Sequence, residues 1–376
     1  MKTIERMLAL GAVAASATMP ALAAPASDFQ ARPHAVFVMT NNADANEVIA
    51  YERNQNGTLH DPHHYPTGGR GSGGTVDPLA SQGSLTLSDD GSYLLAANAG
   101  SGSVSVFRVF GSHLALIDRE PTGGSEPNAV AQHGALVYVL NTAASSNVVG
   151  FRLHDGQLER IPGSLRFLSG NTVNSSSIAF SADGKFLVVT ERSTNSIDVF
   201  HVQADGRLSP ITVNPAAGAG TFSAVFTSDG AIVVSETGGP GPNSSTISSY
   251  AVLSDGKLQP ISTTVPTLGA ANCWNVISPD GRFVYASNAG TSSISGFAIA
   301  KGGALTALPG TVVGNNPAGS ANLDITISSD GGFLYSLNAG SGAIGVFRIE
   351  ADGHLTNFGT LGGLPAGAGL NGIAAN

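Results

Sequence analysis

The chain has 376 residues and a formal net charge of −9 at pH 7; only 11% of its residues are charged, while 42% are hydrophobic. This composition excludes a disordered chain, and the acidic balance gives no electrostatic reason to bind nucleic acid or anionic lipid. The 49 glycines and 19 prolines favour an all-β protein with many tight turns.

The N-terminus has the pattern of a secretory signal peptide. A short basic start is followed by an apolar run over 7–19 and by the small-x-small cleavage site Ala21–Ala23. We therefore expect a signal peptide at 1–23, an N-terminal extension at 24–34 and a periplasmic or secreted mature chain. The apolar run is too short to cross a bilayer comfortably and has no second copy, so no membrane span is expected.

An internal repeat begins after the extension. Each copy starts with a short alternating apolar strand that ends in an Asp-Gly turn, where glycine accepts a positive φ at no steric cost. Five copies of this strand and turn are Ser84–Gly91, Ile178–Gly184, Ala224–Gly230, Asn275–Gly281 and Asp324–Gly331. A sixth copy, Ala129–Gly134, keeps the glycine but has His133 in place of the aspartate.

Three further strands complete each copy, as in Phe283–Ser287 for the second and Ile344–Arg348 for the third. The second strand ends at an anchor residue, and successive anchors are 43 to 57 residues apart, about one repeat each. The seven anchors are Asn41, Asn98, Asn141, Glu191, Glu236, Asn288 and Asn338. Strands of four to seven residues between glycine turns leave no room for crossover helices, so the sheets must be antiparallel.

The two ends of the repeat array are complementary. Ala35–Thr40 is a second strand with no first strand before it, and Gly369–Ala375 is a first strand with nothing after it. The sequence therefore predicts an all-β fold over 35–376: a seven-bladed β-propeller of four-stranded antiparallel blades, closed by the C-terminal strand that completes the N-terminal blade. An open solenoid would instead need polar capping repeats.

Strand direction sorts the loops between two faces. The Asp-Gly turns share the lower face, while the anchor loops and the blade-to-blade connections share the upper face around a central channel, where binding groups are expected. At two anchors the usual Asn is replaced, which makes Glu191, its neighbour Arg192 and Glu236 the candidate catalytic residues. The structural alternative is that each Glu pairs with Arg192 or caps loop amides.

Residues just before the first strands are candidate substrate-binding groups at the channel entrance. They are Gln82, Asn128, Asn174, Phe222, Asn272, Trp274 and Asn322, with Asp324 just inside its strand. The amides could equally satisfy backbone groups, and inter-blade packing is the alternative for Trp274. Cys273 has no partner for an intrachain disulfide, and a buried inert thiol is favoured over a nucleophile.

Two other sequence patterns are not assigned a functional role. His60, His63 and His64 fall in an outermost strand interrupted by prolines, where polar residues protect a sheet edge, so no metal site is assigned to them. The glycine-rich Gly68–Gly74 lacks the ending of a phosphate loop and is interpreted as a flexible connection between blades.

The chain resembles the lactonase family of seven-bladed propellers, which includes propeller-type 6-phosphogluconolactonases and 3-carboxy-cis,cis-muconate cyclases. The motifs that carry the resemblance are Ser278–Asn288, Ser181–Glu191, Gly296–Phe297 and Val346–Arg348. It implies opening or closing of lactones by His, Arg and Glu side chains around the channel. The histidine-rich stretch that often precedes an early inner strand in this family is here Ala80–Gly83.

The favoured function is that of a secreted lactonase-like propeller acting on a small non-phosphorylated lactone or organic acid. Glu191 or Glu236 would activate water, and Arg192 would stabilise the oxyanion. No cofactor is expected, although a calcium ion held by the two Glu and nearby Asn side chains stays open, and a monomer is expected. The alternative is a non-catalytic scaffold that binds a protein or a cell-surface ligand.

Overall fold

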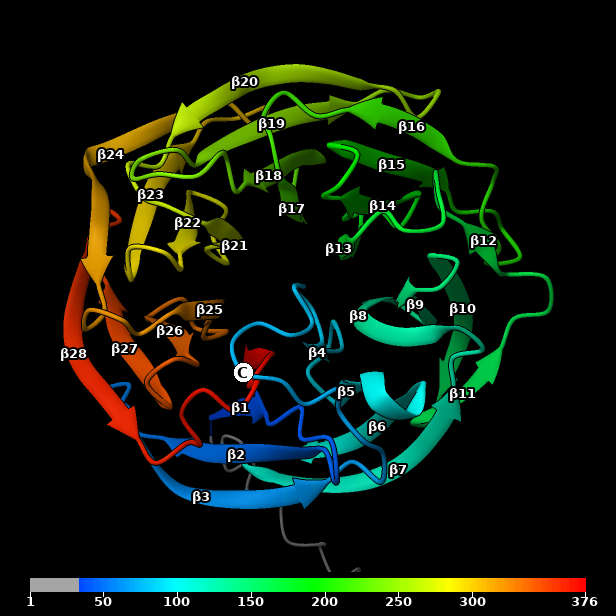
Figure 1. Cartoon of the computed structure of the whole chain (residues 1–376), viewed down its shortest axis with the longest axis horizontal. Helices are drawn as coiled ribbons and strands as arrows, with labels where there is room; N and C mark the ends of the chain where they lie inside the picture. Colours follow the sequence, from blue (N-terminus) through cyan, green and yellow to red (C-terminus); the bar gives the residue numbers. More distant parts are fainter. Residues whose placement is uncertain (1–33) are drawn as a thin grey trace, which may run out of the picture. The chain divides into compact units, whose positions relative to one another are not determined.

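A computed structural model describes residues 34–376, which form a ring of seven antiparallel sheets around a central axis (Figure 1). The predicted signal peptide and nearly all of the predicted extension lie outside the described residues. Apart from the short 3-10 helix η1 (Ala99–Ser101), every element in this part of the chain is a strand. The predicted propeller fold is confirmed.

The sheets are numbered as blades 1 to 7, and their strands are given from the axis outward. Blade 1 has β29 (Ile373–Ala375), β1 (Ala35–Met39), β2 (Glu47–Arg53) and β3 (Leu59–Pro66). Blade 2 has β4 (Leu85–Leu87), β5 (Tyr93–Asn98), β6 (Ser103–Phe110) and β7 (His113–Pro121). Blade 3 has β8 (Ser125–His133), β9 (Leu136–Ala143), β10 (Asn147–His154) and β11 (Gln157–Arg160), with β12 (Arg166–Phe167) also on β10.

The remaining four blades have four strands each. Blade 4 has β13 (Ser175–Phe180), β14 (Phe186–Glu191), β15 (Ser196–His201) and β16 (Thr212–Pro215). Blade 5 has β17 (Thr221–Phe226), β18 (Ala231–Glu236), β19 (Thr246–Val252) and β20 (Leu258–Pro266). Blade 6 has β21 (Asn272–Ile277), β22 (Phe283–Asn288), β23 (Ser293–Ile299) and β24 (Leu305–Asn315). Blade 7 has β25 (Asn322–Ile327), β26 (Phe333–Asn338), β27 (Ala343–Ile349) and β28 (Leu355–Gly362).

The turn between the first two strands of a blade has a local reason to form. In blade 6 the Ser278 hydroxyl donates to the Asp280 carboxylate at 2.6 Å and accepts the Phe283 N–H at 3.0 Å. Gly281 follows with a φ of 73°, which a residue with a side chain rarely adopts. The same Ser/Thr-to-Asp hydrogen bond recurs in blades 2, 4, 5 and 7. Each repeat therefore specifies its own turn.

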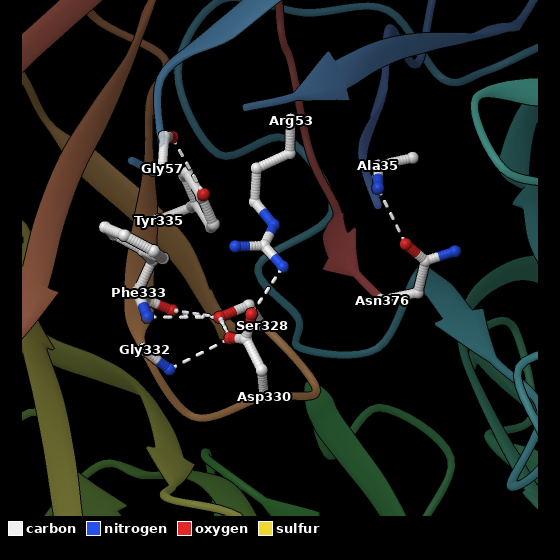
Figure 2. A network of polar contacts seen from close by, with 9 residues as sticks. All are labelled: Ala35, Arg53, Gly57, Ser328, Asp330, Gly332, Phe333, Tyr335 and Asn376. Carbon is white, nitrogen blue, oxygen red and sulfur yellow. Dashed lines mark hydrogen bonds and ion pairs between the residues drawn. The ribbon is translucent and has the colours of Figure 1, made fainter. Parts of the chain in front are cut away.

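The closing blade joins the two ends of the chain. β29 pairs antiparallel with β1, with Val38 opposite Ile373 and Val36 opposite Ala375. Figure 2 shows the Ala35 N–H donating to the Asn376 side chain, at 2.7 Å. The predicted closure by the C-terminal strand is confirmed.

Blade 7 meets blade 1 through contacts shown in Figure 2. The Tyr335 hydroxyl donates to the Gly57 carbonyl at 2.9 Å, and the same contact joins blade 3 to blade 4 and blade 6 to blade 7. The closing seam adds the buried Arg53, whose guanidinium lies 2.6 Å from the Asp330 carboxylate and 5.5 Å from the centre of the Phe333 ring. Ring closure thus reuses the ordinary inter-blade interface and adds an ion pair.

The connection from blade 1 to blade 2 is unusual. The 18 residues 67–84 between β3 and β4 run through the middle of the ring (Figure 1). Their hydrogen bonds reach the inner strands of blades 3, 4 and 6. We call residues 75–84 the plug, because they fill the upper part of the channel.

Candidate functional site

The anchor residues are buried supports of the blade connections. Asn98 and Asn288 are fully buried, and each donates to two serine hydroxyls of the third strand of its blade. A Cβ added to Gly269 would lie only 2.3 Å from the Asn288 side chain, so the incoming connection runs directly over the anchor. The Asn anchors therefore join each connection to the second and third strands.

Glu236 makes the corresponding contacts in blade 5. Its carboxylate accepts the Gly218 N–H at 2.7 Å and the hydroxyls of Thr246 and Ser248 at 2.5 and 2.8 Å. The side chain is fully buried, and the Cβ-free Gly218 lies against it. These three donors satisfy the carboxylate, which has the position and contacts of the Asn anchors.

Glu191 is equally buried in blade 4. It accepts the Ser169 N–H at 2.9 Å and the hydroxyls of Ser169 and Thr194 at 2.5 and 2.6 Å. Asp198, on β15, stands where blades 2 and 6 have the hydroxyls of Ser105 and Ser295, and both of its buried oxygens lack a partner unless a proton is shared with Glu191. Blade 4 therefore holds two carboxyl groups in contact, with no exposed surface on either residue.

One proton stabilises this carboxyl pair. Burial, the hydrogen bond to Glu191 and the negative charge of Glu191 together raise the pKa of Asp198 to about 9. Burial alone would raise the pKa of Glu191, but the hydrogen bonds from Asp198, Ser169 and Thr194 outweigh it and lower that pKa. At neutral pH Asp198 is thus the protonated donor and Glu191 the ionised acceptor.

Replacing Asp198 with Asn is expected to stabilise the protein at alkaline pH. The raised pKa of Asp198 gives stability that is complete below its unfolded pKa near 4 and is lost as the pH rises towards about 9. Asn keeps a donor for Glu191 without that proton, so urea unfolding should show a gain of about 2–4 kcal/mol at pH 8 and little change at pH 4.

The matched control for this prediction is Asp183→Asn in the lower-face turn of the same blade. Hydrogen bonds from Lys185 and Ser181 lower the pKa of Asp183 to about 2, so its contribution to stability is present above pH 4 and is lost as the pH falls towards 2. This variant should lose stability at neutral pH. If the free energy of unfolding of Asp198→Asn changed with pH as steeply as that of the unchanged protein, the assignment of a single shared proton to Asp198 and Glu191 would be contradicted.

The structure does not bring the two predicted catalytic glutamates together. Glu191 and Glu236 face separate sets of donors beneath the connections into blades 4 and 5, and both lie below the rim on which they were placed from the sequence. Their catalytic role stays a prediction, while their contacts are those of the structural alternative, in which Glu caps loop amides.

The inner strands share one irregularity near their upper ends. In blades 3 to 7 a β-bulge interrupts the pairing of the first strand with the second. The residues skipped by the ladder form what we call the bulge ring: Asn128, Ser176, Phe222, Ser223, Cys273 and Asp324. Bulges commonly redirect side chains next to active sites, so this level of the channel is the place to look for chemistry.

The plug is seated on this ring by long-range hydrogen bonds. Gln82 spans the channel to blade 6, donating to the Asn275 carbonyl at 2.7 Å and accepting the Asn275 N–H at 3.1 Å. The Trp274 indole donates to the Ser81 carbonyl at 2.8 Å, and Asn128 donates to the Ser175 carbonyl at 2.9 Å. Gln82, Trp274 and Asn128, predicted to bind substrate, are thus occupied in holding the plug and the inner strands.

The other predicted substrate-binding residues lie in different surroundings. Asn272 and Asn322 open their strands instead of preceding them, and their side chains are buried against the neighbouring blade. Asn174 is exposed on the upper rim, where it donates to Ser193 at 2.6 Å. Phe222 is buried, with its ring 5.1 Å from Trp274. None of these placements tests substrate binding, which stays a prediction for all of them.

A charged cluster lies beside the plug. The Arg192 guanidinium is centred 5.7 Å from the Phe222 ring, and its charge reaches both Asp77 of the plug and Cys273 of the bulge ring. The Asp77 carboxylate accepts the Asn371 amide at 3.2 Å. Arg192 and Asp77 are half-buried and so keep access to solvent.

Asp324 is the second acid of this cluster. It lies in the bulge of β25 and accepts its hydrogen bonds from the backbone N–H groups of Ile325 and Ile373, at 2.9 and 3.3 Å. The negative charge of Asp77 acts on Asp324, so the two acids lie within electrostatic reach of each other. Two of the sequence-predicted residues, Arg192 and Asp324, therefore both lie within electrostatic reach of Asp77.

Both acids titrate near neutrality. Burial raises the pKa of Asp77 to about 7, with Arg192 and hydrogen bonds from Ala80 and Asn371 acting in the opposite direction. Burial also raises the pKa of Asp324 to about 7, against the two backbone donors. A carboxyl group with this pKa can take up and release a proton at physiological pH, as acid–base catalysis requires.

The structure also bears on the sequence-based predictions for the Cys273 thiol and for a metal ion. Burial raises the pKa of Cys273 well above its ordinary value, so the thiol is protonated, as the inert alternative requires. In residues 34–376 no three His, Cys, Asp or Glu side chains are grouped so as to hold a metal ion. Calcium stays a prediction without a site there. His60, His63 and His64 lie in the outermost strand β3, as predicted.

Asp77 is the residue that sequence reasoning missed. It follows the glycine-rich segment interpreted as a flexible connection, and no repeat motif marks it. One signal was present: the 57 residues between the first two anchors exceed every other spacing. Extra length in one connection of a regular array indicates a segment with its own place in the fold.

Comparisons with known proteins give one result for the family and one for the fold. The family model described as lactonase, seven-bladed β-propeller, matches residues 28–174, 145–276 and 275–360. No curated protein matches the chain. Within residues 34–376 there is also no helix with the length and apolarity needed to cross a bilayer.

Solved structures of similar fold cover nearly the whole chain. A 6-phosphogluconolactonase candidate from Bacteroides uniformis is 21% identical, with a TM-score of 0.69, over 92% of this chain and all of that one. A similar candidate from Bacteroides fragilis is 18% identical over 92% and 98% of the two chains, with a TM-score of 0.66. A periplasmic gluconolactonase from Pseudomonas aeruginosa is 17% identical over 91% and 98%, with a TM-score of 0.67. At these identities the likeness establishes the fold alone.

Proposed function

Since the chain belongs to the lactonase family of seven-bladed β-propellers, we propose that it hydrolyses, or in reverse forms, a small non-phosphorylated lactone at the upper mouth of its channel. The observation that supports this site is that Asp77 of the plug, whose pKa is about 7, lies within electrostatic reach of the Arg192 guanidinium and of a second acid with the same raised pKa, Asp324. The proposal moves the catalytic acid from the two glutamates to Asp77.

Asp77 is the general base in this mechanism. Its carboxylate takes a proton from a water molecule, whose oxygen attacks the ester carbonyl of the lactone. Arg192 stabilises the oxyanion that forms, and Phe222 beneath the guanidinium holds it in place. As the carbonyl reforms, the ring C–O bond breaks and the leaving alkoxide recovers the proton from Asp77, leaving a hydroxy acid. The protonated form of Asp324 would limit charge repulsion in the cluster.

The cluster favours a substrate without a phosphate group. Arg192 is the cation that acts on both Asp77 and Cys273, and a second carboxyl group, Asp324, lies within electrostatic reach of Asp77. A phosphate carries about two negative charges at neutral pH and would be repelled by ionised Asp77. A periplasmic or secreted location agrees with this substrate class and rests on the N-terminal pattern of residues 1–23.

The test is a hydrolysis assay on purified mature protein with γ- and δ-lactones, including glucono-δ-lactone and its 6-phosphate. We expect turnover of a non-phosphorylated lactone that rises with pH through about 7, because the base must be ionised. Asp77→Asn should lower kcat/KM by about 100-fold or more, the usual range for a general base. Asp155→Asn, at an exposed position, is the matched control.

Two results would overturn the proposal: turnover in Asp77→Asn equal to that of the unchanged protein, or turnover confined to the phosphorylated lactone. If no lactone in the panel is hydrolysed, the non-catalytic scaffold gains support. Turnover that survives Asp77→Asn but is lost in Glu191→Gln or Glu236→Gln, with unfolding unchanged, would return the catalytic role to the glutamates.

A further inference from the structure

A cavity opens at the lower end of the channel. It has a volume of about 430 Å³, within the range of about 300–1,000 Å³ of small-molecule sites. Its walls are the lower ends of the inner strands and the first turns of blades 2 to 6, so it lies on the face opposite the plug. The proposed hydrolysis does not use it.

The walls of this lower cavity are apolar and open to solvent. Phe180, Val225, Phe226 and Ile277 line it, and each keeps part of its surface exposed. The equivalent residues near the upper ends of these strands are buried under the plug or against neighbouring strands. Apolar surface left open in a concave site favours a ligand with an apolar body.

Three of the four hydroxyl groups that line the cavity are already engaged, the fourth being that of the exposed Ser228. Ser181, Thr227 and Ser278 each donate to the turn aspartate two residues later, at 2.7, 2.6 and 2.6 Å. Each also accepts the backbone N–H that closes its turn. These groups hold the turns and leave little capacity for a ligand.

Blade 3 breaks the turn pattern and contributes the polar groups of the cavity. Where five blades have an aspartate in the first turn, blade 3 has His133, which lies 3.5 Å from Asp89 of blade 2. One oxygen of Asp89 accepts the Gly134 N–H at 2.9 Å. The Asp89 side chain is 55% exposed, so its other oxygen can accept from a ligand.

The charge of the lining is one-sided. Asp89 is its carboxylate, and none of the lining residues within 34–376 is Lys or Arg. The faces of Phe180 and Phe226 add the negative potential that attracts cations. A bound anion would meet Asp89 with no lysine or arginine in the lining to offset it.

We propose that this lower cavity binds a small organic ammonium ion, with an aromatic or branched apolar body against Phe180, Phe226 and Ile277 and its charged head on Asp89. The site is separate from the lactone site, since its lining includes no residue of the Asp77–Arg192 cluster. The ligand class follows from the apolar walls, the single carboxylate and the absence of lysine and arginine from the lining.

The test compares two probes with a similar body and opposite charge, 2-phenylethylammonium and 3-phenylpropionate, by calorimetry and ligand-observed NMR. We expect the ammonium probe to bind with a Kd of about 1 mM, as small ligands of about nine heavy atoms do, and at least tenfold more tightly than the carboxylate. This comparison needs no variant, so a folding defect cannot obscure it. Equal or tighter binding of 3-phenylpropionate would overturn the proposal.

Variants of the cavity residues test where the ammonium probe binds. Asp89→Asn, which keeps an acceptor for Gly134, should weaken binding at least tenfold, and Phe226→Ala should weaken it severalfold. Asp183→Asn, at a lower-face carboxylate outside this lining, should leave the Kd within twofold. Unchanged binding in Asp89→Asn, or binding lost in Asp77→Asn at the upper mouth, would also overturn the assignment.

Discussion

Removal of residues 373–376 is expected to unfold the propeller at 37 °C. The deletion takes away β29, with its register against β1 and the buried side chains of Ile373 and Ala374. Burial of Ile contributes about 2–3 kcal/mol, and each lost backbone hydrogen bond about 0.5–1.5 kcal/mol. The loss of about 4–6 kcal/mol is a large part of the stability of a typical domain. Urea unfolding followed by circular dichroism measures it.

Two controls separate strand loss from the loss of a single contact. Asn376→Ala removes the hydrogen bond from the Ala35 N–H that Figure 2 shows and should cost about 1 kcal/mol. A synthetic peptide of residues 368–376 added to the deletion variant should restore stability as its concentration rises, because it binds the folded form. A deletion variant as stable as the full chain would show that β1 does not need its partner.

Replacing Arg192 with Met should lower lactone turnover by about 100-fold to 1,000-fold, the usual effect of losing an oxyanion donor. Met keeps the length of the side chain over Phe222 but removes the charge. Because that charge lowers the pKa of Asp77, its loss should also move the rising limb of the pH–rate profile to higher pH. The measurement is kcat/KM from pH 5 to pH 9.

The pH shift distinguishes a direct role for Arg192 from a structural one. A merely packed residue would change the rate without moving the profile. Arg192→Lys should restore the profile and part of the rate, because it restores the charge without the planar guanidinium. Arg348→Met, at a half-exposed arginine paired with Glu350, is the control and should have no effect on turnover. Full activity in Arg192→Met would remove this residue from the mechanism.

The fold could be predicted from the sequence because each repeat carries its own turn signal. The Ser278-to-Asp280 hydrogen bond and the positive φ of Gly281 are local, so the same residues recur wherever the turn does. The complementary ends, Ala35–Thr40 and Gly369–Ala375, determine the closing blade. Both kinds of information are present in short segments.

The candidate site could be predicted only in part, because it depends on distant contacts. The repeat singled out Arg192 and the two Glu anchors. It could not show that the Glu carboxylates are buried beneath the connections that lead into blades 4 and 5. The plug has no counterpart in other blades, and Gln82 meets Asn275 across 193 residues of sequence. Asp198 was detectable in principle, since blades 2 and 6 have serine, Ser105 and Ser295, at the same distance after the anchor.

The shared first blade also has a kinetic consequence. The innermost strand of blade 1, β29, is synthesised after every other strand of the propeller, and Asn376 meets Ala35 across 341 residues. Contacts of such high sequence separation form slowly, because a long loop must close before they can stabilise anything. Until the C-terminus is available, β1 presents an unpaired edge to other chains. A prematurely terminated chain is therefore left with an open ring, which makes it recognisable as incomplete to proteases and chaperones.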